Sequence, residues 1–465
     1  MSSNILFRVE QDPAILDFKN KDGVPLWLFM RNFAYETAGC HVFHDEPVRV
    51  TRSSGLGVVK YITRAMLHNV VMQLKKKKSE TIFYTISREV LIDGKYYNQY
   101  TDAYSELVPR NNISIVHPPL DWKWKKPRHN DNVLYSGPNQ LFAAVFASLR
   151  KTRGVDVWPL MNYVAEKMKQ ELDVTLTDQE MERLVRNTCY EMHKTKYHAR
   201  WLTRQCRSRR TKLIVMLGGS YPWYYYLNDM LKSNGVKTAD LQHGWISGTN
   251  RVYNYHENLL DNAYVKRGAP DYFLTYGQWW GSQTNIPHAK TMVVGNPYRE
   301  WSLQNFTEKK RDKLVLIGCS NNTAGYMKLA SDLQEAVGDA YQVIFRPHPT
   351  ERLEAEKIMA EGQCACTVDY GRNLHELLAE TKVLMTEIST VLFESIGMVE
   401  KILVWKTQTS EYMFPNSPFD GFTDFESLMK QLDTDTSAKV GSDDFWDKNW
   451  RENFQKVLSD AGIGQ

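Results

Sequence analysis

The second half of the chain alternates short apolar runs with longer segments of mixed character. The runs are rich in Val, Ile and Leu, as strands buried on both faces are. They lie at residues 313–318, 341–345, 366–370, 382–386 and 401–405. Between them, apolar residues recur at helical spacing at residues 326–337, 351–360, 374–379 and 391–396. This alternation predicts a parallel sheet with helices on both faces.

The middle of the chain has the same pattern. Apolar runs at residues 212–217, 236–241, 272–276 and 291–294 predict strands, and a helical pattern at 223–231 follows the first run. We therefore expect residues from about 212 to 297 to form half of a second doubly wound sheet.

The first 200 residues are more mixed. Strand-like runs occupy residues 5–9, 81–86 and 113–116, and helical patterns occupy 26–35, 58–74 and 140–149. Residues 158–205 are almost continuously helical in pattern, residues 295–310 look like a linker, and residues 443–458 form an amphipathic pattern. We expect an α/β protein with Rossmann-like domains at residues 1–300, including a helical insertion near 158–205, and at 301–440. A C-terminal helix at 441–465 would pack back toward the first domain.

Composition is that of an ordinary globular protein. Hydrophobic residues make up 42% of the chain and charged residues 24%, and the net charge is +4. That imbalance is too small for a dedicated nucleic-acid binder. The six cysteines match no zinc or redox spacing, and the N-terminus does not have the pattern of a signal peptide. There is also no apolar run of about 18 residues. We therefore expect a cytoplasmic protein with reduced thiols. From the charge we expect no nucleic-acid partner.

Positive charge gathers in two runs. Four lysines occupy residues 75–78, and the second run contains Arg204, Arg207, Arg209, Arg210 and Lys212. A solvated surface explains either run, and so does a peripheral contact with the cytoplasmic face of an anionic inner membrane. Both interpretations stay open.

Polar residues follow the strand predicted at residues 236–241, at the end where parallel sheets bind ligands. They are Asp240, Gln242 and His243, and Gly244 turns the chain after them. Because the ordinary pKa of histidine lies near neutrality, His243 could take a proton from a hydroxyl group. Asp240 could do the same or orient His243. The alternative is a histidine that simply caps the strand end.

A glycine-rich turn, Gly218-Gly219-Ser220, follows the strand predicted at residues 212–217. Such a turn lets the backbone approach a ligand closely, although its spacing is not that of the dinucleotide fingerprint. We expect Gly218, Gly219 and Gln242 to line the same cleft.

A third polar exit is Arg346-Pro347-His348-Pro349, which follows the strand at residues 341–345. The two prolines fix the backbone on either side of His348. Arg346 offers a planar fork and His348 a hydrogen-bond donor, a pair suited to a phosphate group. The alternative is an incidental histidine in a proline-rich strand exit. Pro-His-Pro is unusual at a strand end, however, and this favours a function for His348.

Glu387, Ser389 and Thr390 lie where the strand at residues 382–386 gives way to a helix. Free N–H groups at a helix start and nearby hydroxyls favour an anion, although ordinary capping also uses Ser and Thr. Glu387 would repel a phosphate, so it suits ribose or base hydroxyls, or the orientation of His348.

Ser320 and Asn321 follow the strand at residues 313–318 and form another polar exit able to line a nucleotide cleft. No pair of carboxylates in the sequence is arranged to hold a metal, so we expect none.

The order of these motifs resembles that of bacterial surface-polysaccharide glycosyltransferases of the GT-B fold. This group includes capsule Kdo-transferases, sialyl- and polysialyltransferases, and teichoic acid polymerases that use CDP-glycerol. The shared motifs are Gln-His-Gly at residues 242–244, Tyr-Gly at 276–277, Gly-Asn-Pro at 295–297, Arg-Pro-His-Pro at 346–349 and Glu-Ile-Ser-Thr at 387–390. The resemblance covers residues from about 212 to 405.

The resemblance implies two Rossmann-like domains that face a central cleft, with the acceptor in the N-terminal domain and the nucleotide in the C-terminal one. His348, Ser389 and Thr390 would contact the phosphate of a cytidine nucleotide. The other residues of the donor site would be Arg346, Glu387, Ser320 and Asn321.

The resemblance also bears on the base. His243 corresponds to the catalytic histidine of the teichoic acid polymerases, although Trp245 stands where those enzymes usually have Thr. The sialyltransferases use an acidic base, which keeps Asp240 as a candidate.

We therefore expect a glycosyltransferase that moves sialic acid or Kdo from a CMP-activated donor to a growing capsule or lipopolysaccharide glycan, without a permanently bound cofactor. The alternatives are a transferase of the same fold that uses CDP-glycerol or a UDP- or GDP-sugar, a nucleotide-sugar 2-epimerase, and a non-catalytic glycan-binding protein.

Overall fold

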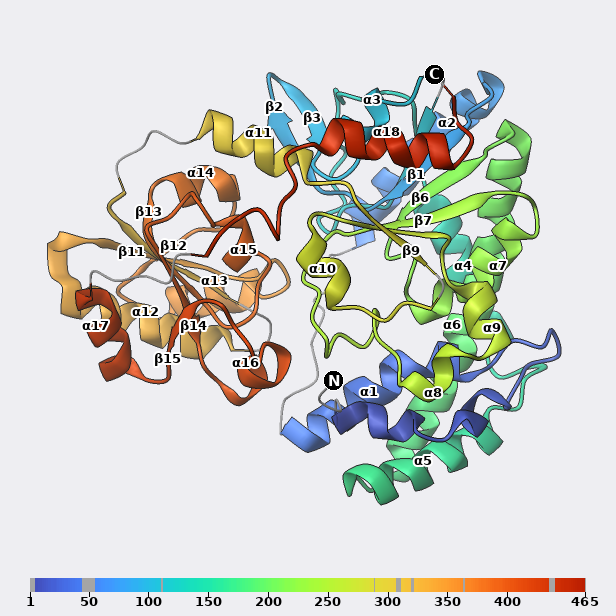
Figure 1. Ribbon diagram of the computed structural model, residues 1–465, viewed down its shortest axis with the longest axis horizontal. Coiled ribbons are helices and arrows are strands. Elements are labelled where there is room, and N and C mark those ends of the chain that lie inside the picture. The colour runs from blue at the N-terminus through green and yellow to red at the C-terminus, as the bar shows by residue number, and fades with distance from the viewer. Residues whose placement is uncertain are drawn as a thin grey trace. The chain divides into compact units, whose positions relative to one another are not determined.

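The computed structural model describes residues 5–43, 55–109, 112–287, 289–306, 311–318, 322–362, 364–434 and 440–464. It divides into two compact units, each built on its own parallel sheet (Figure 1). Of the described residues, unit 1 comprises those at 5–43, 55–297 and 447–464, and unit 2 comprises those at 298–446.

Among the described residues, unit 1 forms a sheet of seven parallel strands in the order β5-β4-β1-β6-β7-β8-β9. The strands are β1 (Thr81–Thr85), β4 (Asn112–Val116), β5 (Val133–Tyr135), β6 (Leu213–Leu217), β7 (Lys237–Leu241), β8 (Tyr272–Thr275) and β9 (Lys290–Val293). The chain builds outward from β1 to β5 and then returns to the other side of β1 at β6. This doubly wound order puts the switch point of the sheet between β1 and β6.

Helices cover both faces of this sheet because successive side chains of a strand point to opposite faces. Val215 of β6 packs against α18 (Trp450–Asp460), together with Phe454 and Leu458 of that helix. Ile214 and Met216 face the other way, toward α6 (Asp178–Arg209) and α7 (Tyr225–Lys232). All five residues of β6 are buried, as the apolar run predicted.

Beside the sheet, unit 1 contains a helical layer with its own core. Its helices are α1 (Trp27–Phe43), α5 (Trp158–Leu172), part of α6, α8 (Glu257–Leu260), α9 (Ala263–Gly268) and the 3-10 turn Pro13–Leu16. The predicted helical stretch at residues 158–205 is two helices, since Asp173 takes a left-handed φ of 56° that ends α5. A capping box of Thr177 and Glu180 then starts α6.

The strand predicted at residues 5–9 is wrong, because Ile5–Glu10 forms a 3-10 helix. The carboxylate of Glu10 must reach the buried guanidinium of Arg31, which also donates to the carbonyl of Asn254 at 2.7 Å. A compact turn brings Glu10 there and still buries Phe7 in the helical core.

Unit 2 repeats the same winding. Its six described strands are parallel and lie in the order β12-β11-β10-β13-β14-β15. They are β10 (Lys313–Ile317), β11 (Gln342–Arg346), β12 (Thr367–Val368), β13 (Thr381–Thr386), β14 (Lys401–Trp405) and β15 (Asp420–Phe422). The switch point lies between β10 and β13.

The helices of unit 2 connect these strands. They are α12 (Thr323–Val337), α13 (Arg352–Ala360), α14 (Leu374–Ala379), α15 (Val391–Glu394), α16 (Gln408–Met413) and α17 (Phe425–Asp433). The prediction of an α/β protein with two Rossmann-like doubly wound parallel sheets is confirmed.

Two elements near the ends of unit 2 differ from the sequence prediction. Much of the predicted linker is helical, as α11 (Pro297–Asn305), and Arg299 of this helix is buried over the ring of Trp446. The C-terminal helix begins only at Trp450. Trp446 donates instead to the carbonyl of Phe393 at 3.0 Å, which fixes the preceding segment in unit 2.

Four strands were missed: β2 (Glu89–Ile92) and β3 (Lys95–Asn98), which form an antiparallel hairpin, and the three-residue strands β5 and β15. The remaining helices of unit 1 are α2 (Gly55–Leu74), α3 (Asp102–Glu106), α4 (Gly137–Arg150) and α10 (Gln278–Ser282).

Candidate functional site

Each sheet gathers its candidate residues at one edge. In a parallel sheet all strands end on the same edge, and ligands bind there near the switch point. In unit 1 the switch point is bordered by Gly218–Ser220, after β6, and by the segment after β1. In unit 2 it is bordered by Gly318, after β10, and by Glu387, after β13.

Asp240 joins two neighbouring strand exits of unit 1. It lies near the end of β7, and its fully buried carboxylate accepts the backbone N–H of Gly218 and that of Ser220, each at 2.9 Å. Burial raises the pKa of Asp240 to about 6, against the effect of these donors. Both carboxylate oxygens are therefore used to hold the glycine-rich turn.

The turn itself requires its glycines. Gly218 has a φ of +82°, and an added Cβ would lie 3.1 Å from the ring of Tyr221. A Cβ on Gly219 would lie 3.3 Å from Cβ of Asp240. The Asn228 side chain of α7 donates to the carbonyl of Gly219 at 2.8 Å, so this helix also holds the turn.

Gln242 performs a similar task on the other side of β7. It is buried, its side-chain oxygen accepts the N–H of Tyr276 at 2.8 Å, and its amide donates to the carbonyl of Gly244 at 3.2 Å. Gln242 thus links the exits of β7 and β8 and fixes the backbone on both sides of His243.

His243 stands between aromatic rings at this edge. The hydroxyl of Tyr221 lies 3.3 Å from its Nε2, and the Tyr100 ring packs edge-on against the imidazole. Burial lowers the pKa of His243 to about 4, and the positive charge of Arg88 acts in the same direction. The imidazole is therefore neutral at pH 7, as a proton acceptor must be.

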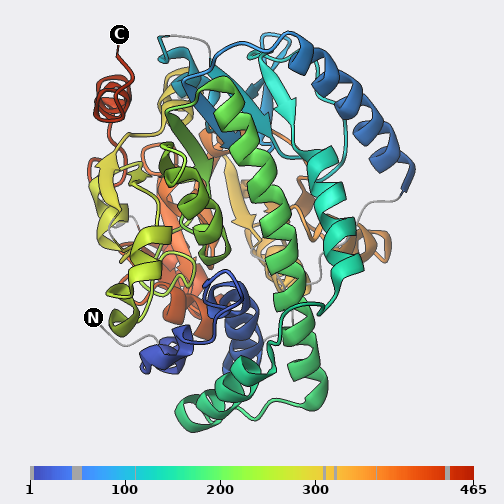
Figure 2. The ribbon, with the colours of Figure 1, turned by 90° about the vertical axis from the view of Figure 1, so that its right-hand side faces the viewer.

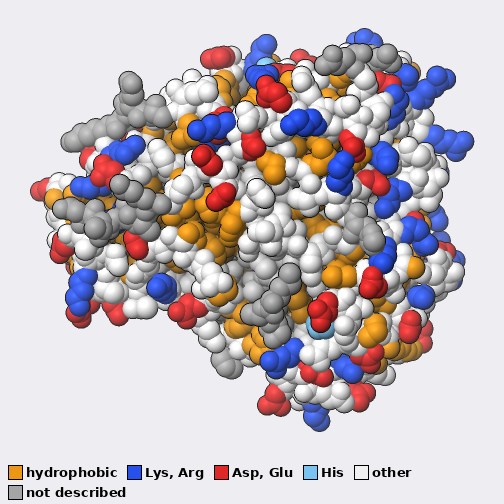
Figure 3. Space-filling view, in the orientation of Figure 1, with side chains coloured by type: hydrophobic (Ala, Val, Ile, Leu, Met, Phe, Trp, Pro, Cys, Tyr) orange, Lys and Arg blue, Asp and Glu red, His pale blue; other side chains and the backbone are white. Residues whose placement is uncertain are grey.

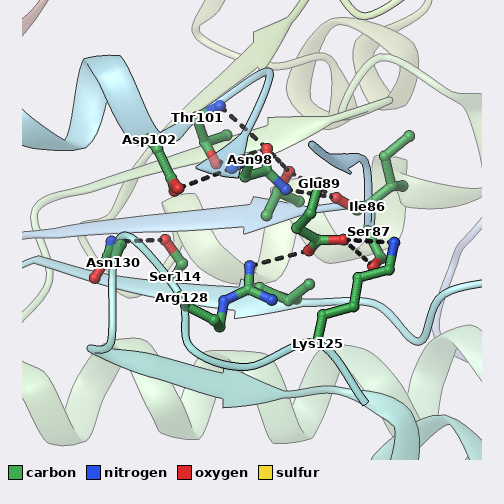
Figure 4. A network of polar contacts seen from close by, with 12 residues as sticks. Ile86, Ser87, Glu89, Asn98, Thr101, Asp102, Ser114, Lys125, Arg128 and Asn130 are labelled. Atoms are coloured by element: carbon green, nitrogen blue, oxygen red, sulfur yellow. Dashed lines mark hydrogen bonds and ion pairs between the residues drawn. The ribbon is translucent and has the colours of Figure 1, made fainter. Parts of the chain in front are cut away.

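A polar network fixes the hairpin of β2 and β3, which lies between Arg88 and Tyr100 in the chain (Figure 4). The buried Glu89 carboxylate binds Arg128 at 3.0 Å and Lys125 at 3.3 Å. Asn98, at the end of β3, donates to the carbonyl of Ile86 at 2.9 Å and accepts the N–H of Tyr100 at 3.1 Å.

Asp102 completes this network by accepting the N–H of Asn98 at 2.8 Å, and burial raises its pKa to about 6. The hairpin is thus fixed to the exit of β1, which borders the switch point.

A cavity of about 180 Å³ opens beside the same edge. Its walls come from strand ends, α4, α6 and the 3-10 turn Pro222–Tyr224. The lining side chains include Tyr84, His117, Gln140, Glu191, Lys194 and Trp223. The Trp223 ring lies 5.0 Å from that of Tyr221, which connects the cavity wall to His243.

The cavity has little net charge. Lys194 pairs with Glu191 at 3.0 Å. Burial lowers the pKa of His117 to about 4 and that of His198 to about 3, so both rings are neutral at pH 7. His198 is held between the Tyr84 hydroxyl at 2.7 Å and the Asn139 side chain at 2.6 Å. The lining offers mixed donors and acceptors beside an aromatic face.

In unit 2, His348 follows β11 in the turn that the two prolines frame. Its Nδ1 lies 2.7 Å from the Thr350 hydroxyl and accepts the N–H of Thr350 at 3.4 Å. When the ring is neutral, its proton therefore sits on Nε2. A Cβ on Gly318 would lie 3.4 Å from the backbone nitrogen of His348, so the exits of β10 and β11 touch.

Arg346 is directed differently from the sequence prediction of a phosphate fork. Its Nη1 binds Asp369 at 2.6 Å and the carbonyl of Arg372 at 2.9 Å. Asp369 follows β12, on the side of β11 opposite to the switch point. One arm of the guanidinium is thus committed to joining two strand exits.

Glu387 is buried directly after β13. Its backbone N–H donates to the Tyr326 hydroxyl at 2.9 Å, and that hydroxyl also lies 3.3 Å from its carboxylate. Ser389 caps the N–H of Val391 at 3.3 Å, and Thr390 makes no side-chain cap. Glu387, Ser389 and Thr390 therefore share the switch-point edge with His348.

Ser320 and Asn321 lie outside the described residues. Within the described part of the chain, no group of three or more His, Cys, Asp or Glu side chains is arranged to hold a metal ion.

Sequence reasoning missed Arg88, Tyr100 and Tyr221, which surround His243. The Asp93-Gly94 pair was a usable signal for the hairpin that carries the first two, since both residues take the positive φ that such a turn needs. Nothing in the sequence pattern connects Tyr100 with His243.

Comparisons with known proteins find likeness of fold only. No protein-family model and no curated protein sequence matches the chain. A UDP-GlcNAc 2-epimerase from Neisseria meningitidis is 7% identical, with 83% of this chain and all of that chain covered, at a TM-score of 0.45. A variant of the wall teichoic acid polymerase TagF is 12% identical, covering 88% of this chain and 98% of that one, also at 0.45. A putative epimerase from Listeria monocytogenes is 11% identical, with 83% and 98% covered, at 0.47.

The raised pKa of Asp240 predicts a pH-dependent stability. Because its folded value of about 6 exceeds the unfolded value of 3.8, this carboxyl favours the folded state below pH 3.8, and the benefit is lost as the pH rises through 6. The free energy of unfolding of Asp240→Asn should therefore improve relative to the native protein by about 2.4 kcal/mol between pH 4 and pH 7. Urea unfolding across this range measures it.

Asp261→Asn is the control, since this carboxylate is 95% exposed. Its difference from the native protein should change by no more than about 0.5 kcal/mol over the same range. A flat difference for Asp240→Asn would contradict the buried, ionised carboxylate.

Proposed function

We propose that the protein is a nucleotide-sugar-dependent glycosyltransferase of the GT-B type, in which unit 2 binds the nucleotide and unit 1 binds the acceptor. The proposed reaction moves sialic acid or Kdo from a CMP-activated donor to a growing surface glycan. The alternatives are CDP-glycerol or a UDP- or GDP-sugar as donor, and a nucleotide-sugar 2-epimerase.

One observation carries the proposal. Residues chosen from the sequence for nucleotide chemistry, above all His348 and Glu387, follow β11 and β13, the strands on either side of β10, at the carboxyl end of a doubly wound sheet. A nucleotide needs an anion-binding part and a part that binds hydroxyls. The Nε2–H of His348 and the hydroxyls of Ser389 and Thr390 supply the first, and the carboxylate of Glu387 supplies the second.

In the proposed donor site, Arg346 is a positioning residue. Its ion pair with Asp369 ties the exits of β11 and β12 together, and this keeps the His348 turn in place. The two prolines restrict the same turn from within.

The proposed chemistry assigns the base to His243. Its Nε2 takes the proton of an acceptor hydroxyl, whose oxygen forms a bond to the anomeric carbon. The bond from that carbon to the donor phosphate breaks, and its electron pair leaves with the nucleotide. With the ring proton on Nδ1, Nε2 carries the lone pair that the step requires, and the Tyr221 hydroxyl at 3.3 Å turns its own proton away when the acceptor hydroxyl binds there. Asp240 is less suited, because both of its oxygens are bound to backbone N–H groups.

The proposed acceptor pocket is the cavity lined by Trp223, whose ring reaches His243 through Tyr221. A cavity with little net charge, mixed donors and acceptors and an indole face suits an uncharged, hydroxyl-rich sugar unit. An anionic unit would meet Glu191 and two neutral imidazoles, and would find Lys194 already paired.

The donor site predicts a loss of nucleotide affinity in His348→Ala. Removing one hydrogen bond to a charged phosphate costs about 1.5–3 kcal/mol, which weakens binding roughly 10- to 100-fold. Calorimetric titration with CMP, CDP and UDP measures this affinity and also shows which nucleobase the site prefers. His129→Ala, an exposed histidine of unit 1, should bind as the native protein does.

Native affinity in His348→Ala would refute the donor site. Release of free nucleotide from a UDP-sugar without any acceptor would favour the epimerase instead of the transferase.

The two candidate bases predict different pH profiles. With His243 as base, kcat/KM should fall with a midpoint near pH 4 on the acid side, because protonation of the free protein removes the lone pair only there. With Asp240, the midpoint would lie near pH 6. We expect the lower midpoint, and a loss of about 10²–10⁴-fold in kcat for His243→Ala. Transfer assays at saturating donor measure both, and unchanged kcat in His243→Ala would exclude it as the base.

The acceptor pocket predicts a selective effect of Trp223→Ala. Loss of the aromatic face should raise KM for the glycan acceptor by about 5- to 10-fold, from roughly 1 kcal/mol of ring packing, and leave nucleotide affinity unchanged. Trp158→Ala, on a partly exposed ring of α5, is the control. Equal KM values for the two variants would remove the pocket from the acceptor site.

A further inference from the structure

Helix α2 turns an apolar face to solvent. Its exposed apolar side chains are Leu56, Val59, Met66, Leu67, Val70, Val71 and Leu74. They recur at intervals of three and four residues, which places them along one side of the helix. Leu56 is 89% exposed and Leu74 is 83% exposed. Contiguous apolar surface of this kind marks an interaction site rather than ordinary surface.

Hydrogen bonds fix the rotation of α2. Tyr61, Ile62 and Ala65 pack inward. Beside them, the Asn69 side chain both donates to the carbonyl of Tyr135 in the edge strand β5 at 2.8 Å and accepts its N–H at 2.9 Å. The His68 ring lies 3.0 Å from the carbonyl of Val133. Turning the apolar side inward would break these bonds and leave the edge of β5 unpaired. The outward apolar face is therefore built into the fold.

Helix α4 extends the surface. Its exposed apolar side chains are Leu141, Phe142, Val145 and Leu149. The two helices pack closely where α4 begins, since a Cβ on Gly137 would lie 3.1 Å from the ring of Tyr61 and 3.3 Å from Ile62. Figure 2 shows both helices, in blue and teal, on the same side of unit 1.

The charge on this surface has one sign. Residues 55–78 and 137–154 contain no Asp or Glu. The exposed basic residues of the two segments are Lys60, Arg64, Lys75, Lys76, Lys77, Lys78, Arg150, Lys151 and Arg153. On the face drawn in Figure 3, by contrast, Asp and Glu side chains lie among the Lys and Arg side chains.

We propose that α2 and α4 form a docking surface for a membrane rich in anionic lipids. Apolar side chains would enter the headgroup boundary, and the lysines and arginines would contact lipid phosphates. An apolar face flanked by basic residues and free of acidic ones matches such a surface in both properties. Within the described residues no helix is long and apolar enough to cross a membrane, so α2 would lie in the plane of the interface.

The second basic run does not form part of this surface as a continuous patch. Arg209 is buried and donates to the side-chain oxygen of Gln205 at 2.6 Å. The docking proposal uses no residue of either switch point, so it stands or falls independently of the proposed transfer reaction.

Vesicle flotation of the full chain tests the proposal. The native protein should float with vesicles that contain phosphatidylglycerol and much less with phosphatidylcholine alone. The double variant Leu67→Ser with Leu74→Ser should lose at least about tenfold in partitioning, because two exposed leucines no longer enter the apolar layer. The double variant Lys75→Glu with Lys77→Glu should lose a similar factor, and only on anionic vesicles.

Leu353→Ser, at a leucine of unit 2 that is 59% exposed, is the matched control and should float as the native protein does. Unchanged thermal unfolding and nucleotide binding would show that the variants fold. Failure of the native protein to float, or native flotation of both double variants, would overturn the proposal. The native protein could instead form a dimer and bind no vesicles. If the double variant Leu67→Ser with Leu74→Ser dissociated that dimer, the face would belong to a second copy of the chain, and the membrane proposal would be overturned.

Discussion

The buried carboxylate of Asp240 is the interaction on which the candidate site of unit 1 depends. It holds the Gly218–Ser220 turn from the neighbouring strand, and that turn leads directly into Tyr221, which contacts His243. A carboxylate is suited to this because it offers two acceptors to two N–H groups that would otherwise be buried without partners. Burial also removes the carboxylate from water, and this desolvation raises the pKa of Asp240.

Both units follow the same logic, in which one set of residues positions another. Asp240 and Gln242 fix the backbone around His243, as Arg346 and Asp369 fix the strand exit that carries His348. The supporting residues are charged or polar and are held by bonds within the protein, so they resemble functional residues when only the sequence is known.

The sequence predicted the sheets well because their signal is local. Five buried apolar residues ending at a glycine, as in β6, specify a central parallel strand without any knowledge of the rest of the fold. The 3-10 helix at Ile5–Glu10 could not be foreseen, since its shape follows from the distant Arg31. The polar strand exits were predicted for the same reason as the strands. The sequence did not predict that Asp240 holds the turn at Gly218. That role depends on burial and on which backbone N–H groups of the turn need an acceptor.

Helix α2 shows a further limit of sequence patterns. Residues 58–74 read as a helix, and the usual expectation is that its apolar side packs on the sheet. Tyr61, Ile62 and Ala65 do pack there. The edge strand β5 also has exposed N–H and carbonyl groups that need partners, and Asn69 provides them. Satisfying the edge with Asn69 directs Leu67 and Val70 to solvent. In the proposed docking, the membrane covers this exposed apolar side of α2. The same helix would then contact the edge strand β5 on one side and lipid on the other.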